Sequence, residues 1–234
     1  MSIAVLPSGL RPQFPADPRG IRPRSNGLVA LGGDYTPETV LEAYRKGIFP
    51  WEGEDPIPWF SPDPRALLVP RAFRASGSLR KLDRRGVLTV TFDTAFDEVI
   101  ESCATIARPR QEGTWITAPV FDTWRALHGR GLAHSVEVWE EGELVGGLYG
   151  LVLGRAFFGE SMFARRSDAS KIALLHLCRR LHLLSFHMID CQQDTRHLRT
   201  LGAVTVPRLR YLVLLRAALS WPNGWRVSAD EGSA

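Results

Sequence analysis

The pattern of hydrophobic and polar positions becomes regular only after Pro70. Most of the 16 prolines stand at or before this residue. Proline fixes φ and removes a backbone hydrogen-bond donor, so this first part should form turns and extended segments with few long helices. The sequence therefore predicts two domains, a small Pro-rich N-terminal domain over residues 1–64 and a larger domain over residues 65–234.

One helix is predicted within the N-terminal part, over residues 36–46. Thr36 is a suitable N-cap because its hydroxyl can accept from the first free backbone amides. Pro37 is favoured in the first turn, and Gly47 follows as a stop signal.

Regular patterns fill the larger domain. Apolar positions at helical spacing predict helices over residues 95–104, 120–128, 167–184, 194–201 and 211–219. Short runs rich in β-branched and aromatic residues predict strands over 87–92, 135–140, 143–153, 155–161, 187–192 and 203–206. The links between the three middle strands are so short that these strands should pair as antiparallel hairpins.

The order β-α-α-β-β-β-α-β-α-β-α resembles the acyltransferase fold of the GNAT superfamily. We therefore expect an α+β (mixed α/β) domain with a central, mostly antiparallel sheet flanked by helices. Acetyltransferases of this fold carry glycines after the fourth strand, whose amides bind the pyrophosphate of coenzyme A. The corresponding segment here, SMFARRSDASK (161–171), has no glycine. The scaffold suits acyl transfer, but the sequence argues against a coenzyme A thioester as the donor.

Composition and charge narrow the class of protein. The 234 residues carry a formal net charge of +4, which permits a polyanionic partner such as RNA without requiring one. The three cysteines lack C-x-x-C spacing, so they suggest neither a zinc site nor a disulfide framework. The chain shows no apolar run of membrane-spanning length and no signal-peptide pattern, which predicts a cytoplasmic protein.

Several motifs along the chain together resemble those of one family. They are NGLVALGGD (26–34), YRKGIFPW (44–51), WFSPDPR (59–65), EGTWIT (112–117), HSVEVW (134–139), LVGGLYG (144–150), FGESMF (158–163), ASK (169–171), IDCQ (189–192) and HLRTLGA (197–203). In this order they look like the leucyl/phenylalanyl-tRNA–protein transferases.

The resemblance implies transfer of leucine or phenylalanine, and less well methionine, from aminoacyl-tRNA to proteins with N-terminal Arg or Lys. That transfer creates a degradation signal in the N-end pathway. Charged tRNA and acceptor proteins would be the partners, with no membrane involved. The aminoacyl ester is already activated, so the implied reaction would need no ATP, no metal and no cofactor. Two alternatives are a different GNAT-type acyltransferase and an RNA-binding adaptor that has kept the fold.

Three polar residues are the candidate catalytic groups. Asp190 and Gln192 stand two apart on a predicted strand, so their side chains should project to one face. Glu160 ends another central strand, and the resemblance places all three at the active site. Asp190 would orient Gln192 or accept a proton, Gln192 would contact the reacting amine or carbonyl, and Glu160 would hold the donor ammonium or the basic acceptor.

The donor and the tRNA require further surfaces. An apolar pocket should hold the donor side chain, with Leu148, Phe157, Met162, Leu177 and Ile189 as candidates. Trp51 and Trp115 stand in loops and are candidates for stacking on the 3′ adenosine. Basic residues before the first strand of the larger domain should contact the tRNA backbone: Arg74, Arg80, Lys81, Arg84 and Arg85.

Overall fold

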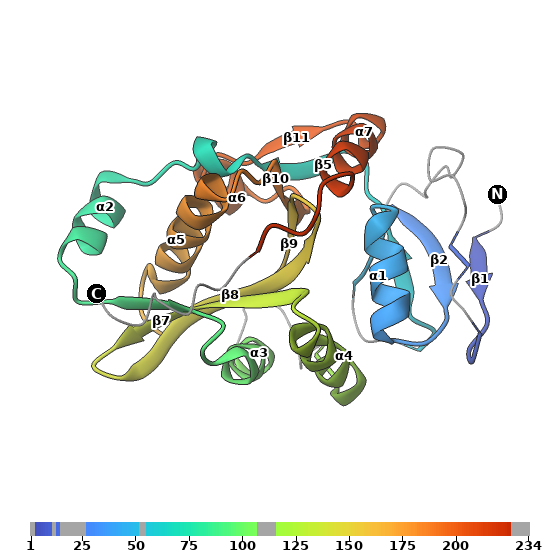
Figure 1. Ribbon diagram of the computed structural model, residues 1–234, viewed down its shortest axis with the longest axis horizontal. Coiled ribbons are helices and arrows are strands. Elements are labelled where there is room, and N and C mark those ends of the chain that lie inside the picture. The colour runs from blue at the N-terminus through green and yellow to red at the C-terminus, as the bar shows by residue number, and fades with distance from the viewer. Residues whose placement is uncertain (1–2, 11–12, 15–26, 52–54, 107–115, 226–234) are drawn as a thin grey trace.

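Two β-sheets organise the chain in the computed structural model, which describes residues 3–10, 13–14, 27–51, 55–106 and 116–225 (Figure 1). The smaller sheet has the order β1-β2-β4-β3 and the larger β11-β5-β10-β9-β8-β7-β6. The strands are β1 (Ala4–Leu6), β2 (Leu28–Gly32), β3 (Phe49–Pro50), β4 (Pro58–Phe60), β5 (Arg65–Leu68), β6 (Thr89–Phe92), β7 (Ala133–Glu140), β8 (Glu143–Leu153), β9 (Ala156–Ala164), β10 (Met188–Gln192) and β11 (Val204–Val206).

The helices cover these sheets. They are α1 (Pro37–Arg45), α2 (Gly77–Arg84), α3 (Phe96–Thr105), α4 (Ala118–Gly129), α5 (Ala169–Leu183), α6 (Arg196–Thr200) and α7 (Arg208–Leu219). A short 3-10 turn, Pro70–Ala72, follows β5. Helix α1 begins as predicted, because the Thr36 hydroxyl accepts from the backbone amide of Thr39 at 3.2 Å.

The larger sheet is antiparallel except for β9 and β10, which run parallel on either side of the crossover through α5. The predicted fold class, with its mostly antiparallel sheet flanked by helices, is thus confirmed. In the larger domain every predicted helix and strand is present, with ends displaced by a few residues.

Strand β5 was not predicted. It begins with Arg65, and a charged residue followed by only three apolar residues does not predict a buried strand. All four residues are nevertheless buried. The strand pairs with both β10 and β11 and so lies inside the sheet. The strands of the smaller sheet were also missed, because each spans only a few residues between turns.

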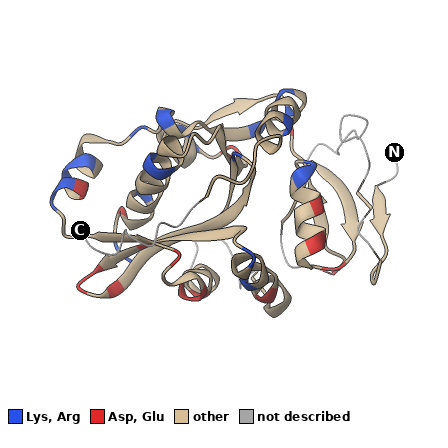
Figure 2. Ribbon diagram, in the orientation of Figure 1, with Lys and Arg blue, Asp and Glu red and all other residues tan. Residues whose placement is uncertain are grey.

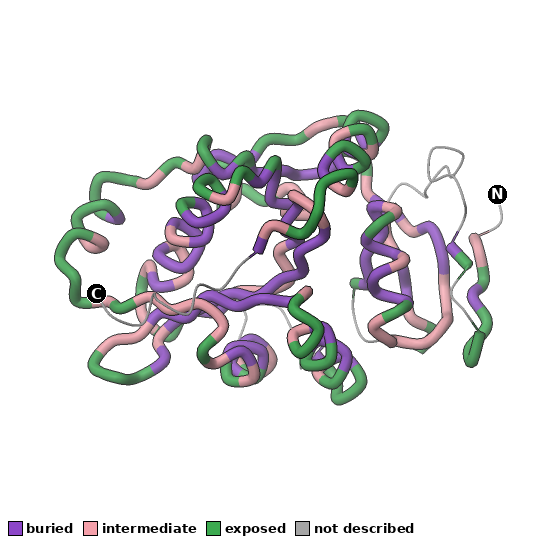
Figure 3. Tube along the Cα trace, in the orientation of Figure 1, coloured by how far each residue is buried: buried purple, intermediate pink, exposed green. Residues whose placement is uncertain are grey.

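Side chains alternate between two buried clusters, one on each face of the larger sheet. Leu148, Phe157 and Ile189 belong to the cluster under α5. Phe158 and Met188 belong to the opposite cluster, which continues through α3 and α4 into α1 and the smaller sheet. The buried strands between these layers appear in Figure 3. The two sheets share a core, and the division at residue 64 stays a prediction.

Close packing explains the glycine pair in β8. A Cβ at Gly146 would stand 2.5 Å from the Cβ of Ala169, at the start of α5. One at Gly147 would stand 2.8 Å from the carbonyl oxygen of Val136. Gly146 thus lets the start of α5 approach the sheet, and Gly147 lies too close to the Val136 backbone to accept a Cβ.

Candidate active site

Strands β9 and β10 part in the middle of the larger sheet. Their last paired residues are Phe158 and Asp190. Beyond that point β9 continues along β8, while β10 continues along β5. Each strand has an irregularity there: Glu160 is an extra residue opposite β8, and Cys191 an extra residue opposite β5. Such bulges bend strands and redirect side chains, and here they open the sheet.

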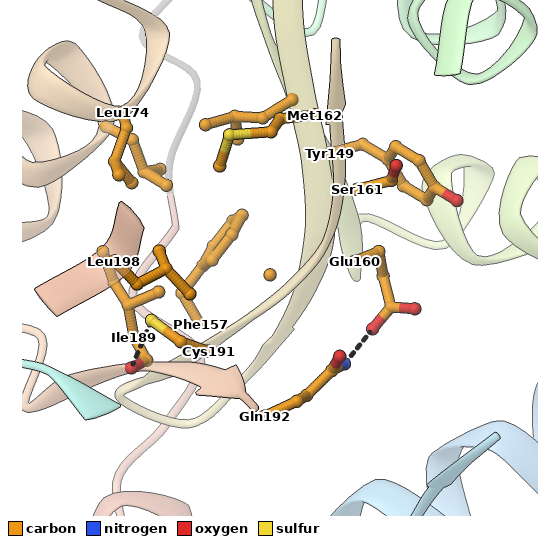
Figure 4. Close-up of a pocket in the computed structure, with 13 residues that line it drawn as sticks. Tyr149, Phe157, Glu160, Ser161, Met162, Leu174, Ile189, Cys191, Gln192 and Leu198 are labelled. Carbon is orange, nitrogen blue, oxygen red and sulfur yellow. Dashed lines mark hydrogen bonds between the residues drawn. The ribbon is translucent and has the colours of Figure 1, made fainter. Parts of the chain in front are cut away.

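A cavity of about 270 Å³ lies at this opening (Figure 4). All five residues predicted for the donor pocket line it, namely Leu148, Phe157, Met162, Leu177 and Ile189. Leu174 of α5 and Leu198 of α6 complete its apolar wall. Glu160 and Gln192 line the same cavity, so an apolar space and a polar pair share one site.

Glu160 and Gln192 are joined by a hydrogen bond. The Gln192 Nε2 donates to Glu160 Oε1 at 3.1 Å, and the Tyr44 hydroxyl from α1 donates to the same oxygen (Figure 4 shows the Gln192 bond). Gln192 has φ 61°, in the left-handed region that non-glycine residues seldom adopt. Local strain of this kind often accompanies functional sites.

Burial raises the pKa of Glu160 to about 8. The hydrogen bond from Tyr44 opposes this shift, and the nearby charge of Asp190 adds to it. At neutral pH the free protein therefore holds Glu160 mostly protonated. A cation entering the cavity would favour the ionised form, because an opposite charge lowers the pKa of a carboxyl.

Asp190 lies outside the cavity lining and is fully buried. Arg65 donates to both of its oxygens, from Nε at 2.8 Å and from a terminal nitrogen at 2.7 Å. The Tyr211 hydroxyl and the Gln192 backbone amide donate as well, at 2.7 and 2.9 Å. The carboxylate thus accepts four hydrogen bonds, one of which holds the backbone of Gln192.

Arg65 is itself enclosed. Its guanidinium stands 4.6 Å from the ring centroids of Phe49 and Tyr211, and it donates to the Gly47 carbonyl at 3.3 Å. Burial acts to lower the pKa of Arg65, but the charge of Asp190, the nearby Tyr211 and the hydrogen bonds to Asp190 together outweigh this and raise it. The guanidinium therefore remains a permanent cation beside Asp190.

Sequence reasoning missed three polar residues around the site: Tyr44, Arg65 and Tyr211. Two signals were available. Tyr44 and Arg65 stand within motifs that carry the family resemblance, and Arg65 opens an otherwise apolar run. Tyr211 sits on a helix that the pattern marks only as apolar, so only the fold brings its hydroxyl to Asp190.

Cys191 also lines the cavity. Burial raises the pKa of its thiol, with the charge of Asp190 adding to the effect. Because the thiolate is the reactive form, this cysteine is a poor nucleophile at neutral pH.

Trp51 follows β3 and is 39% exposed. Its ring packs edge-on against Phe60 at 5.4 Å and near Phe49 at 6.4 Å. Since Phe49 contacts Arg65, Trp51 is linked by packing to the Asp190 cluster. The second predicted stacking residue, Trp115, lies outside the described residues.

The five predicted tRNA-contacting residues are all exposed: Arg74, Arg80, Lys81, Arg84 and Arg85. Helix α2 carries three of them and ends with Arg85 as its C-cap, while Leu79 anchors its buried side. Asp83 of the same helix binds Arg179 of α5 at 2.7 Å. Figure 2 shows the basic positions on α2 and α5.

Over the described part of the chain, no group of three or more His, Cys, Asp or Glu side chains is arranged to hold a metal ion. None of the helices described is long and apolar enough to cross a membrane.

Two family models match the chain. The model described as leucyl/phenylalanyl-tRNA protein transferase matches residues 67–216, and the model of the N-terminal domain of the same transferases matches residues 33–63. With the apolar cavity and its polar pair, these matches define the class of protein as an aminoacyltransferase. The chain belongs to the leucyl/phenylalanyl-tRNA–protein transferase family, which confirms the resemblance.

Curated relatives carry the same name. The leucyl/phenylalanyl-tRNA–protein transferase of Stutzerimonas stutzeri is 52% identical, over 86% of this chain and 90% of its own length. That of Myxococcus xanthus is 51% identical, over 91% of each chain.

Solved structures are more distant. A GCN5-related N-acetyltransferase from Kribbella flavida aligns with a TM-score of 0.37 and 11% identity, over 76% of this chain and 63% of its own. A Staphylococcus epidermidis protein of unknown function aligns with a TM-score of 0.42 and 12% identity, over 62% and 57%. The chain thus spans less than two thirds of these structures.

Proposed function

We propose that this protein transfers leucine or phenylalanine, and less well methionine, from aminoacyl-tRNA to the N-terminal Arg or Lys of acceptor proteins. The new peptide bond extends the acceptor by one residue and creates a degradation signal. The observation that carries the proposal is the apolar cavity of about 270 Å³ with Glu160 and Gln192 in its wall.

The reaction is aminolysis of an ester. The acceptor α-amine attacks the carbonyl carbon of the aminoacyl ester, and the C–N bond forms as the C–O bond to the 3′ ribose oxygen breaks. The proton lost by the amine ends on that ribose oxygen. An α-amine has a pKa near ~7.7–8.0, so a useful fraction is neutral at pH 7. The ester already carries the activation, so positioning is the main requirement.

The donor side chain occupies the apolar part of the cavity, between α5 and β9. Apolar pockets discriminate by only about 1–3 kcal/mol per methylene, which fits acceptance of both leucine and phenylalanine. The donor α-ammonium then lies near Glu160, at the polar part of the same wall. Its charge favours the ionised carboxylate, so donor binding and ionisation of Glu160 support each other.

Gln192 is the group proposed to contact the reacting amine or carbonyl, because it lines the cavity and its Nε2 is anchored on Glu160. Asp190 is proposed as an orienting group rather than a base. Its oxygens already accept four hydrogen bonds and it is fully buried, so it acts through the Gln192 backbone.

The tRNA is proposed to bind through two surfaces. The exposed face of Trp51 can stack on the 3′ adenosine, an interaction worth about 1–3 kcal/mol per base. The basic side of α2 can contact phosphates, which would allow several tRNAs to bind because backbone contacts carry no sequence information. Aminoacyl-tRNA is a cytoplasmic substrate, so we place the reaction in the cytoplasm.

Transfer of labelled leucine from Leu-tRNA to peptides beginning with Arg or with Ala tests this function. The reaction is run without ATP, metal or coenzyme A. Label on the Arg peptide alone is expected. Binding of tRNA without transfer would instead favour an RNA-binding adaptor. Transfer in a parallel reaction that offers an acyl thioester in place of Leu-tRNA would favour a different acyltransferase.

A further inference from the structure

The chain turns back after α7 and ends its described course at Trp225 (Figure 1). This segment lies beyond residue 216, where the family match stops. Trp225 is nevertheless only 8% exposed and belongs to the buried cluster under α5. A large aromatic residue is thus inserted into the same layer that holds the apolar part of the cavity.

Trp225 is held there by three polar residues. Its Nε1 donates to Asp93 Oδ2 at 2.9 Å, and its ring stacks on His134 with centroids 4.3 Å apart. The guanidinium of Arg180, from α5, lies over the Trp225 ring, 4.9 Å from its centroid. His134 in turn contacts Asp93, between Nδ1 and Oδ2 at 3.0 Å. The contacts come from β7, α5 and the end of β6, so they determine the position and tilt of the indole.

Trp225 also contacts the wall of the cavity. Its ring lies 6.1 Å from that of Phe157, with 31° between the planes. Phe157 lines the cavity and is 1% exposed. The Phe157 ring also lies against the backbone of Gly150, where a Cβ would stand 2.6 Å from its Cε1. Phe157 therefore lies against both Gly150 and Trp225, and loss of the indole would give its ring room on the side of Trp225.

We propose that Trp225 is a positioning residue for donor specificity: by bracing Phe157, it limits the size of the pocket that receives the donor side chain. The inference rests on the proposed function, which assigns this cavity to the donor. Removing the indole lets the Phe157 ring retreat into the space behind it and lengthens the cavity. The phenylalanine side chain then gains contacts with the cavity wall, and the leucine side chain loses contacts with it.

The test measures kcat/KM for Leu-tRNA and Phe-tRNA with the full-length protein and its Trp225→Ala variant. The ratio of Phe to Leu transfer should rise about tenfold, the order of the effect of one methylene in an apolar pocket. The change should appear in KM for Leu-tRNA rather than in kcat. Trp225→Phe keeps an aromatic brace and should restore most of the wild-type ratio.

A neighbouring tryptophan supplies the matched control. Trp221 lies on the same segment, is 54% exposed and contacts His187 rather than the cavity wall. Trp221→Ala should leave the Phe to Leu ratio unchanged. If Trp225→Ala fails to fold, Trp225→Leu is measured in the same way and should shift the ratio in the same direction.

A second readout separates this inference from the proposed function. Analogues of leucyl- and phenylalanyl-adenosine with a 3′-amide in place of the ester bind but cannot transfer. The ratio of their affinities therefore measures the side-chain preference of the pocket alone. A wild-type ratio in both assays for Trp225→Ala, or for Trp225→Leu where it replaces Trp225→Ala, overturns the inference, and so does an equal fall for both donors. Neither outcome affects the proposed transferase activity. Absence of transfer by the wild-type protein overturns the proposed function instead, and a shifted analogue ratio would then still support the role of Trp225.

Discussion

Replacing Arg65 by Met should destabilise the protein strongly. The change removes two hydrogen bonds to Asp190 and the only cation found beside this carboxylate among the described residues. Asp190 and Arg65 are 0% and 1% exposed, so water cannot take the place of the guanidinium. Removing one partner of a buried ion pair lowers the free energy of unfolding by about 3–5 kcal/mol. Because Tyr211 and the Gln192 amide still donate to Asp190, we expect a loss of about 3 kcal/mol, a large part of a typical domain's stability.

Urea unfolding gives the free energy of unfolding for wild type and variant. Arg125→Met is the matched control, because Arg125 donates to Asp97 in a pair whose side chains are 57% and 43% exposed. An exposed pair contributes little, so this control should stay near wild type. The double variant Arg65→Met, Asp190→Leu should recover most of the stability but not the transfer activity. A loss below about 1 kcal/mol for Arg65→Met would refute the reasoning, because a buried pair should cost more than that.

Three further predictions concern pH, the pocket and the tRNA. The folded protein keeps a proton on Glu160 up to about pH 8, while the unfolded chain releases it near 4.5. Stability measured by urea unfolding should therefore fall by roughly 1 kcal/mol per pH unit from about pH 5 to 8, and Glu160→Gln should flatten that decline. Leu174→Phe fills the cavity and should lower kcat/KM for Phe-tRNA about tenfold more than for Leu-tRNA. Reversing the charges of Arg80 and Arg84 should weaken tRNA binding and flatten its salt dependence, measured by filter binding.

Control variants sharpen these tests. Leu183 lies on the same helix as Leu174 but is 83% exposed, so Leu183→Phe should leave the donor ratio unchanged. Arg125→Glu on α4 and Arg130→Glu at its C-cap apply the same charge change away from α2 and should leave the salt slope intact. A flat pH profile in the wild type would contradict the protonated Glu160, and equal salt slopes for both charge-reversal pairs would contradict the role assigned to α2.

Local patterns predicted most of the larger domain because its helices and strands follow their periods. The apolar wall of the cavity could be predicted as well, since Phe157 and Ile189 alternate with the residues of the opposite face. Short strands between prolines gave no such signal, and neither did β5, whose Arg65 is polar at a buried position.

The polar cluster could be predicted only in part. A strand pattern predicts that Asp190 and Gln192 project to the same face, but it carries no information on the bulge at Cys191 between them. In the structure Gln192 lines the cavity and Asp190 does not. Tyr44 and Tyr211 reach Glu160 and Asp190 from helices far away in the chain. Contacts of that kind depend on how the layers pack, which local periodicity does not encode.

Single-turnover transfer from Leu-tRNA to an Arg-beginning peptide, by wild type and by Gln192→Ala, tests the central claim most directly. The tRNA dissociation constant of each protein is measured alongside. If Gln192 contacts the reacting groups, the variant should bind tRNA normally and transfer about 10²–10³-fold more slowly, as when one preorganised donor is lost. Transfer at the wild-type rate by Gln192→Ala would contradict this account of the site.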